Sequence, residues 1–225
     1  MSNGNFSDFS FADNPDPRCA VVLVLDASGS MGEVGPSGKS AIEELNEGLK
    51  VFENELNTDE LAARRVEICV VSVGAEVKAL GGFITANAWV APVLEPSGAT
   101  PLGEGLELAL DLLEERKLMY RANGVSYYRP WILCISDGTP TDEVAKAAKR
   151  IKEAEEKKAL AFFAVGIDGA NMGVLESLGT RSALKMKGMA FKELFVWLSA
   201  SQARVSASRV GESVALADVS GWASV

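Results

Sequence analysis

One acidic and two hydroxyl side chains alternate directly after the first apolar segment of the sequence. Residues 19–25 are apolar on both faces, and Asp26-Ala27-Ser28-Gly29-Ser30 follows them. A second apolar segment, residues 131–135, is followed by Ser136-Asp137. An acid at the end of a buried strand costs free energy unless it has a partner. If the two strands are neighbours, both carboxylates lie at the same edge of a sheet.

A further hydroxyl, that of Thr100, lies in Ser97-Gly98-Ala99-Thr100-Pro101-Leu102-Gly103, which predicts a tight turn that opens a helix. The sequence thus offers five oxygen donors: Asp26, Ser28, Ser30, Thr100 and Asp137. A hard divalent cation such as Mg²⁺ takes oxygen ligands in near-octahedral geometry. Because neutral hydroxyls leave much of the charge of a metal ion uncompensated, such a site suits the capture of an Asp or Glu from a partner protein.

Apolar and amphipathic segments alternate along the chain and would position these side chains. Strands are predicted at residues 19–25, 66–73, 131–135, 160–167 and 183–186, and helices at 39–56, 102–119, 142–158 and 191–201, with one more helix before the last strand. Residues 76–85 predict a short edge strand or hairpin arm, and residues 86–98 an irregular segment. The order predicts an α/β fold, a doubly wound and mostly parallel sheet with helices on both faces. Ligands bind such sheets beyond the carboxyl ends of the strands.

The chain is expected to hold one domain with two flanking segments. Residues 1–17 are polar and contain two prolines, which predicts a flexible lead-in. Residues 18–201 carry all the predicted elements. Residues 202–225 form a tail rich in Ser, Ala and Val, either packed on the domain or free.

Composition excludes several classes of protein. The 225 residues include 22 basic and 31 acidic side chains, a net charge of -9, and no histidine. Without histidine there is no Ser-His-Asp triad, histidine zinc site or histidine general base. The acidity argues against a nucleic-acid binder, which normally shows a basic footprint, and against binding to anionic membranes.

The cysteines and the N-terminus indicate the compartment. The chain has an odd number of cysteines: Cys19, Cys69 and Cys134. They are widely spaced and lie in apolar segments, which predicts buried, reduced thiols. The polar N-terminus lacks the pattern of a signal peptide, and no apolar stretch reaches the roughly 18 residues of a membrane span. We therefore expect a cytoplasmic protein.

The spacing of the five oxygen donors resembles the metal-ion-dependent adhesion site of von Willebrand factor A (VWA) domains, over roughly residues 19–200. The resemblance implies that Ser28, Ser30 and Thr100 bind Mg²⁺ (or Mn²⁺ or Ca²⁺) directly, and that Asp26 and Asp137 act through water. It also implies a Rossmann-like sheet with one antiparallel edge strand. The implied function is a metal-dependent protein–protein interaction module that is not an enzyme.

Other segments are similar to the compact bacterial VWA proteins of the tellurium-resistance type (TerY-like). These segments are residues 98–104, 136–142, 191–199 and 211–216. This resemblance implies a role in a stress response, with a protein kinase or a PP2C-type phosphatase as partner. Some relatives carry a C-terminal zinc ribbon, whose cysteines this chain lacks.

Two other functions compete with this interpretation. Asp26 and Asp137 at two strand ends have the layout of haloacid-dehalogenase-type phosphatases, in which Asp26 would be the nucleophile of a Mg²⁺-dependent reaction. Those enzymes place an acid two residues later, where this chain has Ser28. The third candidate is a scaffold whose metal site is only structural.

Several conspicuous residues have ordinary interpretations. Asp142 is expected to cap the helix that follows it, and Asp168 to be a loop acid. Lys39-Ser40 is similar to the end of a P-loop, but Glu33 stands where that pattern requires glycine. Trp131 and Trp197 are expected in or near the core, with Trp89 and Trp222 as candidate exposed anchors.

Overall fold

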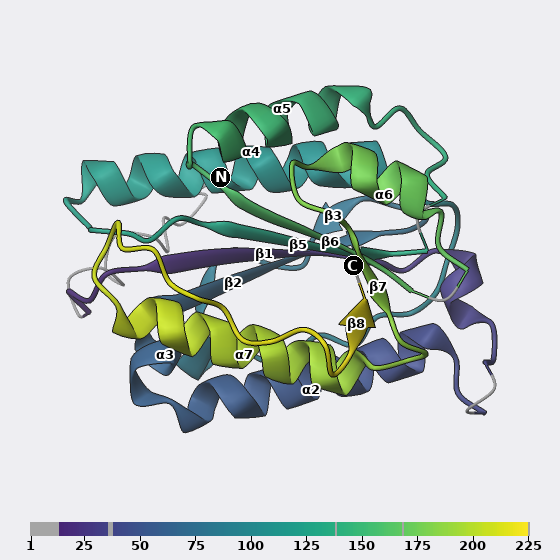
Figure 1. The fold of residues 1–225 in the computed structure, drawn as a ribbon, viewed down its shortest axis with the longest axis horizontal. Coiled ribbons are helices and arrows are strands. Elements are labelled where there is room, and N and C mark those ends of the chain that lie inside the picture. The colour runs from purple at the N-terminus through teal and green to yellow at the C-terminus, as the bar shows by residue number, and fades with distance from the viewer. Residues whose placement is uncertain (1–13, 36–37, 138, 168, 225) are drawn as a thin grey trace, which may run out of the picture.

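A single sheet between two layers of helices makes up the protein (Figure 1). The computed structural model describes residues 14–224 except 36–37, 138 and 168. The sheet has the order β3-β2-β1-β5-β6-β7-β8, and β4 also pairs with β2. Its strands are β1 (Cys19–Asp26), β2 (Val66–Val73), β3 (Lys78–Ala79), β4 (Ile84–Thr85), β5 (Trp131–Ser136), β6 (Ala161–Gly166), β7 (Leu184–Met186) and β8 (Ala223–Ser224).

The five neighbouring strands β2, β1, β5, β6 and β7 run parallel, as the predicted doubly wound sheet requires. The central strands β1, β2 and β5 are buried along their whole length, because helices cover both faces. The predicted antiparallel edge is present, since β3 and β4 pair antiparallel with β2. At the opposite edge β8 adds a second antiparallel pair, with β7.

Helices α2, α3 and α7 cover one face of the sheet, and α4, α5 and α6 cover the other (Figure 1). Each face has its own hydrophobic core, because the side chains of a strand alternate between the two faces. The helices are α2 (Ala41–Thr58), α3 (Glu60–Arg65), α4 (Leu102–Ala122), α5 (Ala145–Glu156), α6 (Met172–Leu178) and α7 (Phe191–Ala207), with 3-10 turns η1 (Gly29–Gly32) and η2 (Ala86–Ala88).

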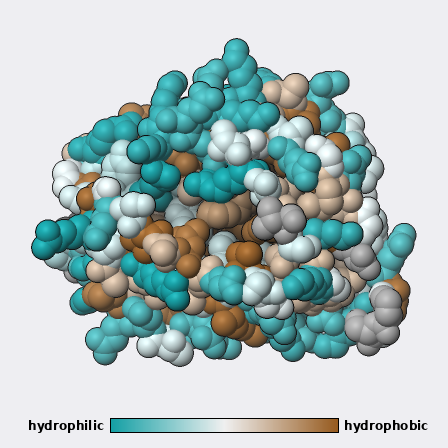
Figure 2. Space-filling view, in the orientation of Figure 1, coloured by the Kyte–Doolittle hydropathy of each residue, from teal (hydrophilic) through white to brown (hydrophobic). Residues whose placement is uncertain are grey.

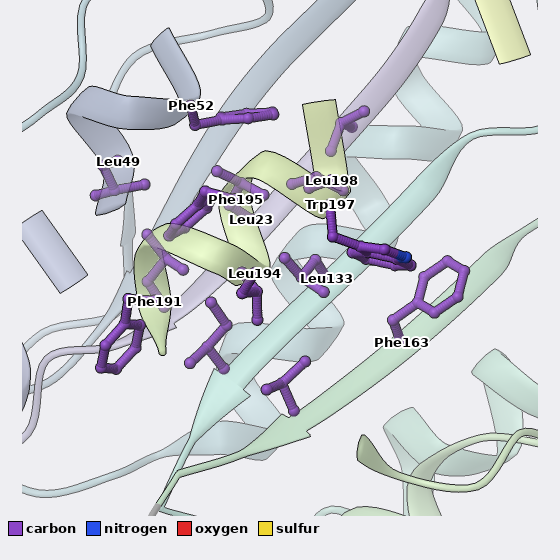
Figure 3. Packing of buried hydrophobic residues seen from close by; sticks show 14 of the residues in the cluster. Leu23, Leu49, Phe52, Leu133, Phe163, Phe191, Leu194, Phe195, Trp197 and Leu198 are labelled. Carbon is purple, nitrogen blue, oxygen red and sulfur yellow. The ribbon is translucent and has the colours of Figure 1, made fainter. Parts of the chain in front are cut away.

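Aromatic side chains of α7 fill the space between this helix, the sheet and α2 (Figure 3). Phe195 lies 5.5 Å from Phe52 of α2, and Trp197 lies 5.6 Å from Phe163 of β6, measured between ring centroids. Gly48 of α2 faces Phe195 so closely that a Cβ atom there would lie 2.7 Å from the ring. The close approach of α2 and α7 therefore depends on this glycine.

The C-terminal segment returns across α7 to the sheet. Trp222 is 2% exposed, and its ring lies 5.3 Å from that of Trp197. The indole nitrogen of Trp197 donates to the carbonyl of Ala217, at 2.8 Å. Trp222 and Trp89 are thus buried, and the idea that they are exposed anchors was wrong. Helix α7 also continues six residues beyond the predicted end at residue 201.

A buried cluster of charges joins the beginning of β1 to β2 and α4. Arg18 and Arg116 both contact the carboxylate of Glu67, and the hydroxyl of Tyr120 donates to it as well. Arg18 also donates to the backbone carbonyls of Asn14 and Asp16, at 2.7 and 2.8 Å. Residues 14–17 are therefore fastened to the amino end of the sheet, and residues 1–13 lie outside the described part.

Candidate metal centre

The pairing of β1 with β5 places the two predicted carboxylates at one edge of the sheet. Leu25 lies opposite Ile135, so Asp26 and Asp137 both follow at the carboxyl end of this pair. The chain continues from β1 to β2 on one side, whereas β5 lies on the other. This is the switch point at which open α/β sheets bind their ligands.

A chain of hydrogen bonds joins four of the five predicted site residues. The amide of Ser28 donates to Oδ1 of Asp26 at 2.9 Å, and the hydroxyl oxygens of Ser28 and Ser30 are 3.0 Å apart. The hydroxyl of Ser30 donates to Oδ2 of Asp137 at 2.5 Å. Asp26 and Ser28 are buried and Ser30 is exposed, so the cluster opens to solvent on the side of Ser30.

Thr100 is brought to the same edge by its loop. The amide of Ser97 donates to the carbonyl of Ala27 at 2.8 Å, and the amide of Gly29 donates to the carbonyl of Gly98 at 3.0 Å. Gly98 has φ +70°, and a Cβ atom there would lie 2.4 Å from the backbone of Ala75, so only glycine fits. Thr100 itself is 5% exposed, and no hydrogen bond between its hydroxyl and the other four residues is present among the described contacts.

Asp26 is held from two sides in a dry environment. Besides the Ser28 amide, Oδ2 of Asp26 accepts a hydrogen bond from the hydroxyl of Ser136, at 2.6 Å. Burial raises the pKa of Asp26, the hydrogen bonds from Ser136 and Ser28 oppose this rise, and the charge of Asp137 adds to it. Ser136, which directly precedes the motif residue Asp137 in the sequence, is thus a supporting residue that was not predicted.

The spacing of the two serine hydroxyls fits a hexacoordinate cation. Neighbouring oxygens around Mg²⁺ at about 2.0–2.1 Å lie about 2.9 Å apart. The 3.0 Å between the Ser28 and Ser30 oxygens matches such an octahedron edge. The hydroxyl of Ser30 has lone pairs that could bind a cation while its hydrogen stays bonded to Asp137. The described part of the chain holds no group of three acidic or cysteine side chains of metal-binding type, and a metal here would depend on hydroxyls.

Asp142 supports the Thr100 loop in an unexpected way. Its carboxylate accepts hydrogen bonds from the amides of Gly103 and Glu104, at 2.9 and 2.8 Å. It therefore caps α4, and the prediction that it caps the following helix was wrong. That helix, α5, begins only at Ala145 and has no side-chain cap. The amide of Thr141 also donates to the carbonyl of Thr100, at 2.9 Å, so the segment after β5 fixes the start of α4.

Two other sequence features lie away from the centre or outside the described residues. The hydroxyl and amide of Ser40 form a capping box with Glu43 at the start of α2, a structural role that explains this serine without a nucleotide. Asp168 belongs to the residues that the structure does not describe.

A family model decides where the protein belongs. The model of the von Willebrand factor type A domain matches residues 20–194, which is most of the chain. The chain belongs to this family. The VWA fold agrees with the sheet order and with the placement of the centre at the carboxyl ends of β1 and β5.

Several solved structures share the fold at low sequence identity. The pilus adhesin SpaC from Lactobacillus rhamnosus GG is 13% identical, with a TM-score of 0.62 over 84% of this chain and 31% of the adhesin. Proximal thread matrix protein 1 from the mussel byssus, solved with zinc in its MIDAS motif, is 14% identical, with a TM-score of 0.55 over 84% of this chain and 49% of that one. BatB from Bacteroides thetaiotaomicron is 15% identical, with a TM-score of 0.52 over 82% and 98% of the two chains.

This chain thus spans half or less of the adhesin and of the mussel protein. The curated proteins contain no match to it. Among the described residues, none of the helices combines the length and the apolar character needed to cross a bilayer.

Proposed function

We propose that this VWA domain captures an acidic side chain of a partner protein through a divalent cation held at the candidate metal centre. In this proposal Ser28, Ser30 and Thr100 bind the cation directly, and Asp26 and Asp137 hold it through water. The observation that carries the proposal is the 3.0 Å separation of the serine oxygens at the solvent-facing end of the switch point. The zinc-occupied MIDAS motif of the mussel protein, which shares this fold, supports the proposal of a metal site.

Charge explains why an acidic partner is favoured. Three of the five proposed site residues are neutral, so a bound Mg²⁺, Mn²⁺ or Ca²⁺ ion would leave this edge locally positive. The chain as a whole carries -9 and repels acidic surfaces elsewhere. A partner Asp or Glu that completes the coordination sphere would therefore be drawn to one spot.

The biological setting that we propose follows from the TerY-like segments. It is a cytoplasmic bacterial tellurium-resistance or stress-response system, with a protein kinase or a PP2C-type phosphatase as partner. Residues 211–216, one of those segments, lie along α7, where Arg204 donates to the carbonyl of Leu216 at 2.9 Å.

The phosphatase alternative has weaker support from the geometry. A nucleophilic carboxylate must reach its substrate, whereas Asp26 is fully buried and both of its oxygens accept hydrogen bonds from within the protein. Hydrolysis of a generic phosphomonoester with Mg²⁺ that is abolished by Asp26→Asn would overturn the proposed binding function.

A thermal-shift titration tests the metal site. Mg²⁺ or Mn²⁺ should raise the Tm of the metal-free protein, because a ligand that binds only the folded state stabilises it by mass action. The double variant Ser28→Ala with Ser30→Ala should fold and lose this rise. The matched control is Ser126→Ala with Ser213→Ala, two exposed serines away from the centre. An equal rise of Tm in both variants would contradict the proposal.

A pull-down with metal and with chelator tests the capture step. The wild type should retain a partner only with metal, and Asp26→Ala should lose it. If the double variant Ser28→Ala with Ser30→Ala still captures the partner but is less stable than the wild type, a structural role of the metal would be favoured instead.

A further inference from the structure

A basic groove lies at the opposite end of the sheet from the candidate metal centre. The loops that enter β5 and β6, the ends of α4 and α7, and the segment 210–216 line it. These segments meet at the left of Figure 1, whereas the loops of the metal centre follow the other end of the strands. The groove has a volume of about 820 Å³, within the range of small-molecule sites. We call it the basic groove.

The lining of the groove is strongly cationic in a protein that is acidic overall. Its charged residues are Lys117, Arg121, Arg129, Lys158 and Arg181, with Glu212 as the single acid. Lys117 pairs with Glu114, and Arg181 pairs with the buried Glu155. Arg129 and Lys158, both exposed, have no carboxylate within salt-bridge distance in the described part of the chain.

The pairing of β5 with β6 brings together the two chain segments that carry Arg129 and Lys158. Arg129 lies just before β5 and Lys158 just before β6, and the two strands pair in parallel from Trp131 and Ala161 onward. The amide of Ala161 donates to the carbonyl of Pro130, at 2.9 Å, which ties the two entering loops together. Both side chains line the same groove, and Glu212, the acid of that lining, forms no ion pair with either of them among the described contacts.

An aromatic ring lies beside the cations. Tyr127 is the one partly exposed aromatic residue of the lining, since Tyr128, Trp131 and Phe163 are buried. Arg121 donates to the hydroxyl of Tyr127 at 3.1 Å, and the ring lies 5.2 Å from that of Tyr120, between centroids. The ring is thus fixed in place. Figure 2 shows that hydrophobic residues reach the surface in the middle of the face seen in this view, between hydrophilic borders.

We propose that the basic groove binds a compact organic phosphate of nucleotide size. Guanidinium groups bind phosphate oxygens through paired hydrogen bonds, and an aromatic side chain offers a surface for a ring of the ligand. A compact anion is favoured over a long one, because a polyanion that extends beyond the groove meets a surface with a net negative charge. This proposal is independent of the proposed metal-dependent function.

Calorimetric titration of the full-length protein tests the proposal. ATP, ADP, AMP, pyrophosphate and inorganic phosphate are the probes, with a chelator present so that no metal contributes. ATP should bind more tightly than pyrophosphate, and inorganic phosphate least tightly. The affinity for ATP should fall with rising salt.

Two charge-reversal variants show where the probe binds. Arg129→Glu with Lys158→Glu should weaken ATP binding about 100-fold, since it removes two charge-assisted contacts. Lys50→Glu with Lys149→Glu changes the net charge equally, on exposed positions of α2 and α5 outside the groove, and should leave the affinity nearly unchanged. Circular dichroism should show that both proteins are folded.

A third variant tests whether the ring of Tyr127 contributes to ATP binding. Tyr127→Leu should weaken the binding of ATP and leave that of pyrophosphate unchanged. The proposal is overturned if no probe binds at millimolar concentration, if the control variant loses as much affinity as the groove variant, or if inorganic phosphate binds as tightly as ATP.

Discussion

At the scale of single residues, Ser136 decides how Asp26 is held. A carboxylate without exposure to solvent needs partners for both oxygens, and the Ser28 amide and the Ser136 hydroxyl supply them. The negative charge of Asp137 lies nearby and raises the pKa of Asp26 further. The arrangement keeps the acid in place at the base of the cluster while Ser30 remains accessible.

Removing the Ser136 hydroxyl should therefore destabilise the protein. Ser136→Ala leaves one oxygen of a buried acid unpaired, and we expect a loss of about 1–3 kcal/mol in the free energy of unfolding. Urea denaturation measures it. Ser199→Ala is the matched control, because among the described contacts its hydroxyl donates to the Val196 carbonyl of its own helix and not to a charged group. Equal losses in the two variants would show that Ser136 has no special role.

The cysteines should be inert in the folded protein. Burial raises the pKa of Cys19 from 9.0 to about 12 and that of Cys69 to about 11. At pH 9 iodoacetamide should therefore label neither thiol until urea unfolds the chain, since the thiolate is the reactive form.

The raised pKa values of Cys19 and Cys69 also predict that the protein becomes less stable in alkali. Because the folded pKa values are raised, unfolded thiols ionise first, and the stability contributed by the buried thiols is lost as pH rises above 9 toward the folded pKa. Rapid native labelling of Cys69 would contradict this view of the thiols.

At the scale of elements, the metal centre depends on one crossing segment between β5 and α5. Asp142 caps α4 from a position that is 39 residues away from Gly103. Gly103 leaves the room for this contact, because a Cβ atom there would lie 2.3 Å from the carbonyl oxygen of Glu143. The start of α4, and with it Thr100, is therefore set by the chain that follows Asp137.

Loss of this cap should weaken both the fold and the metal site. Asp142→Ala should lower the free energy of unfolding by about 0.5–2 kcal/mol and reduce the rise of Tm that Mg²⁺ produces, because Thr100 is no longer fixed. Asp59→Ala removes the cap of α3, at the other end of the molecule, and should reduce stability only. An unchanged metal response in Asp142→Ala would contradict this role.

The elements also show how far sequence reasoning reaches. The long apolar strands β1, β2 and β5 were predictable, because burial on both faces leaves an unbroken apolar run. Helix α3, with six residues, was missed because it spans too few turns for a period. Strand β8 has two residues, and its pairing depends on Trp222, which only the folded sheet can place. The amides that Asp142 caps, those of Gly103 and Glu104, are likewise too far away in the sequence to be predicted as its partners.

For the site, the motif predicted which residue types are present and that Asp26 and Asp137 lie at the same edge of the sheet. The pairing of β1 with β5 confirms the shared edge. The supporting residue Ser136 was missed, because a hydroxyl beside a motif acid carries no signal of the strand that it faces.

At the scale of the whole molecule, the C-terminal segment acts as a strap over α7. It joins that helix through Trp197 and Arg204, fills the core with Trp222 and ends in the sheet as β8. The hydroxyl of Ser201 accepts a hydrogen bond from the Ala217 amide, at 3.2 Å. The fold of the domain therefore includes residues well beyond the end of the family match at residue 194.

Trp222→Ala should destabilise the whole domain. The side chain is buried against Trp197, and its removal should lower the free energy of unfolding by about 3–5 kcal/mol. Val210→Ala, at an exposed position of the same segment, should change it little. Urea denaturation distinguishes the two, and a small effect of Trp222→Ala would show that the strap contributes little to folding.

The position of β1 at the centre of the sheet has a consequence for biosynthesis. Its neighbour β5 is made late, since the paired residues Val21 and Trp131 are 110 positions apart. While the ribosome is still translating that interval, the backbone of β1 has no neighbouring strand on the β5 side. The carboxylate of Asp26 also lacks the hydrogen bond from Ser136 until then. Such distant pairing slows folding, and an open apolar edge exposes a nascent chain to aggregation. We expect this protein to depend on chaperones most until residue 136 has left the ribosome.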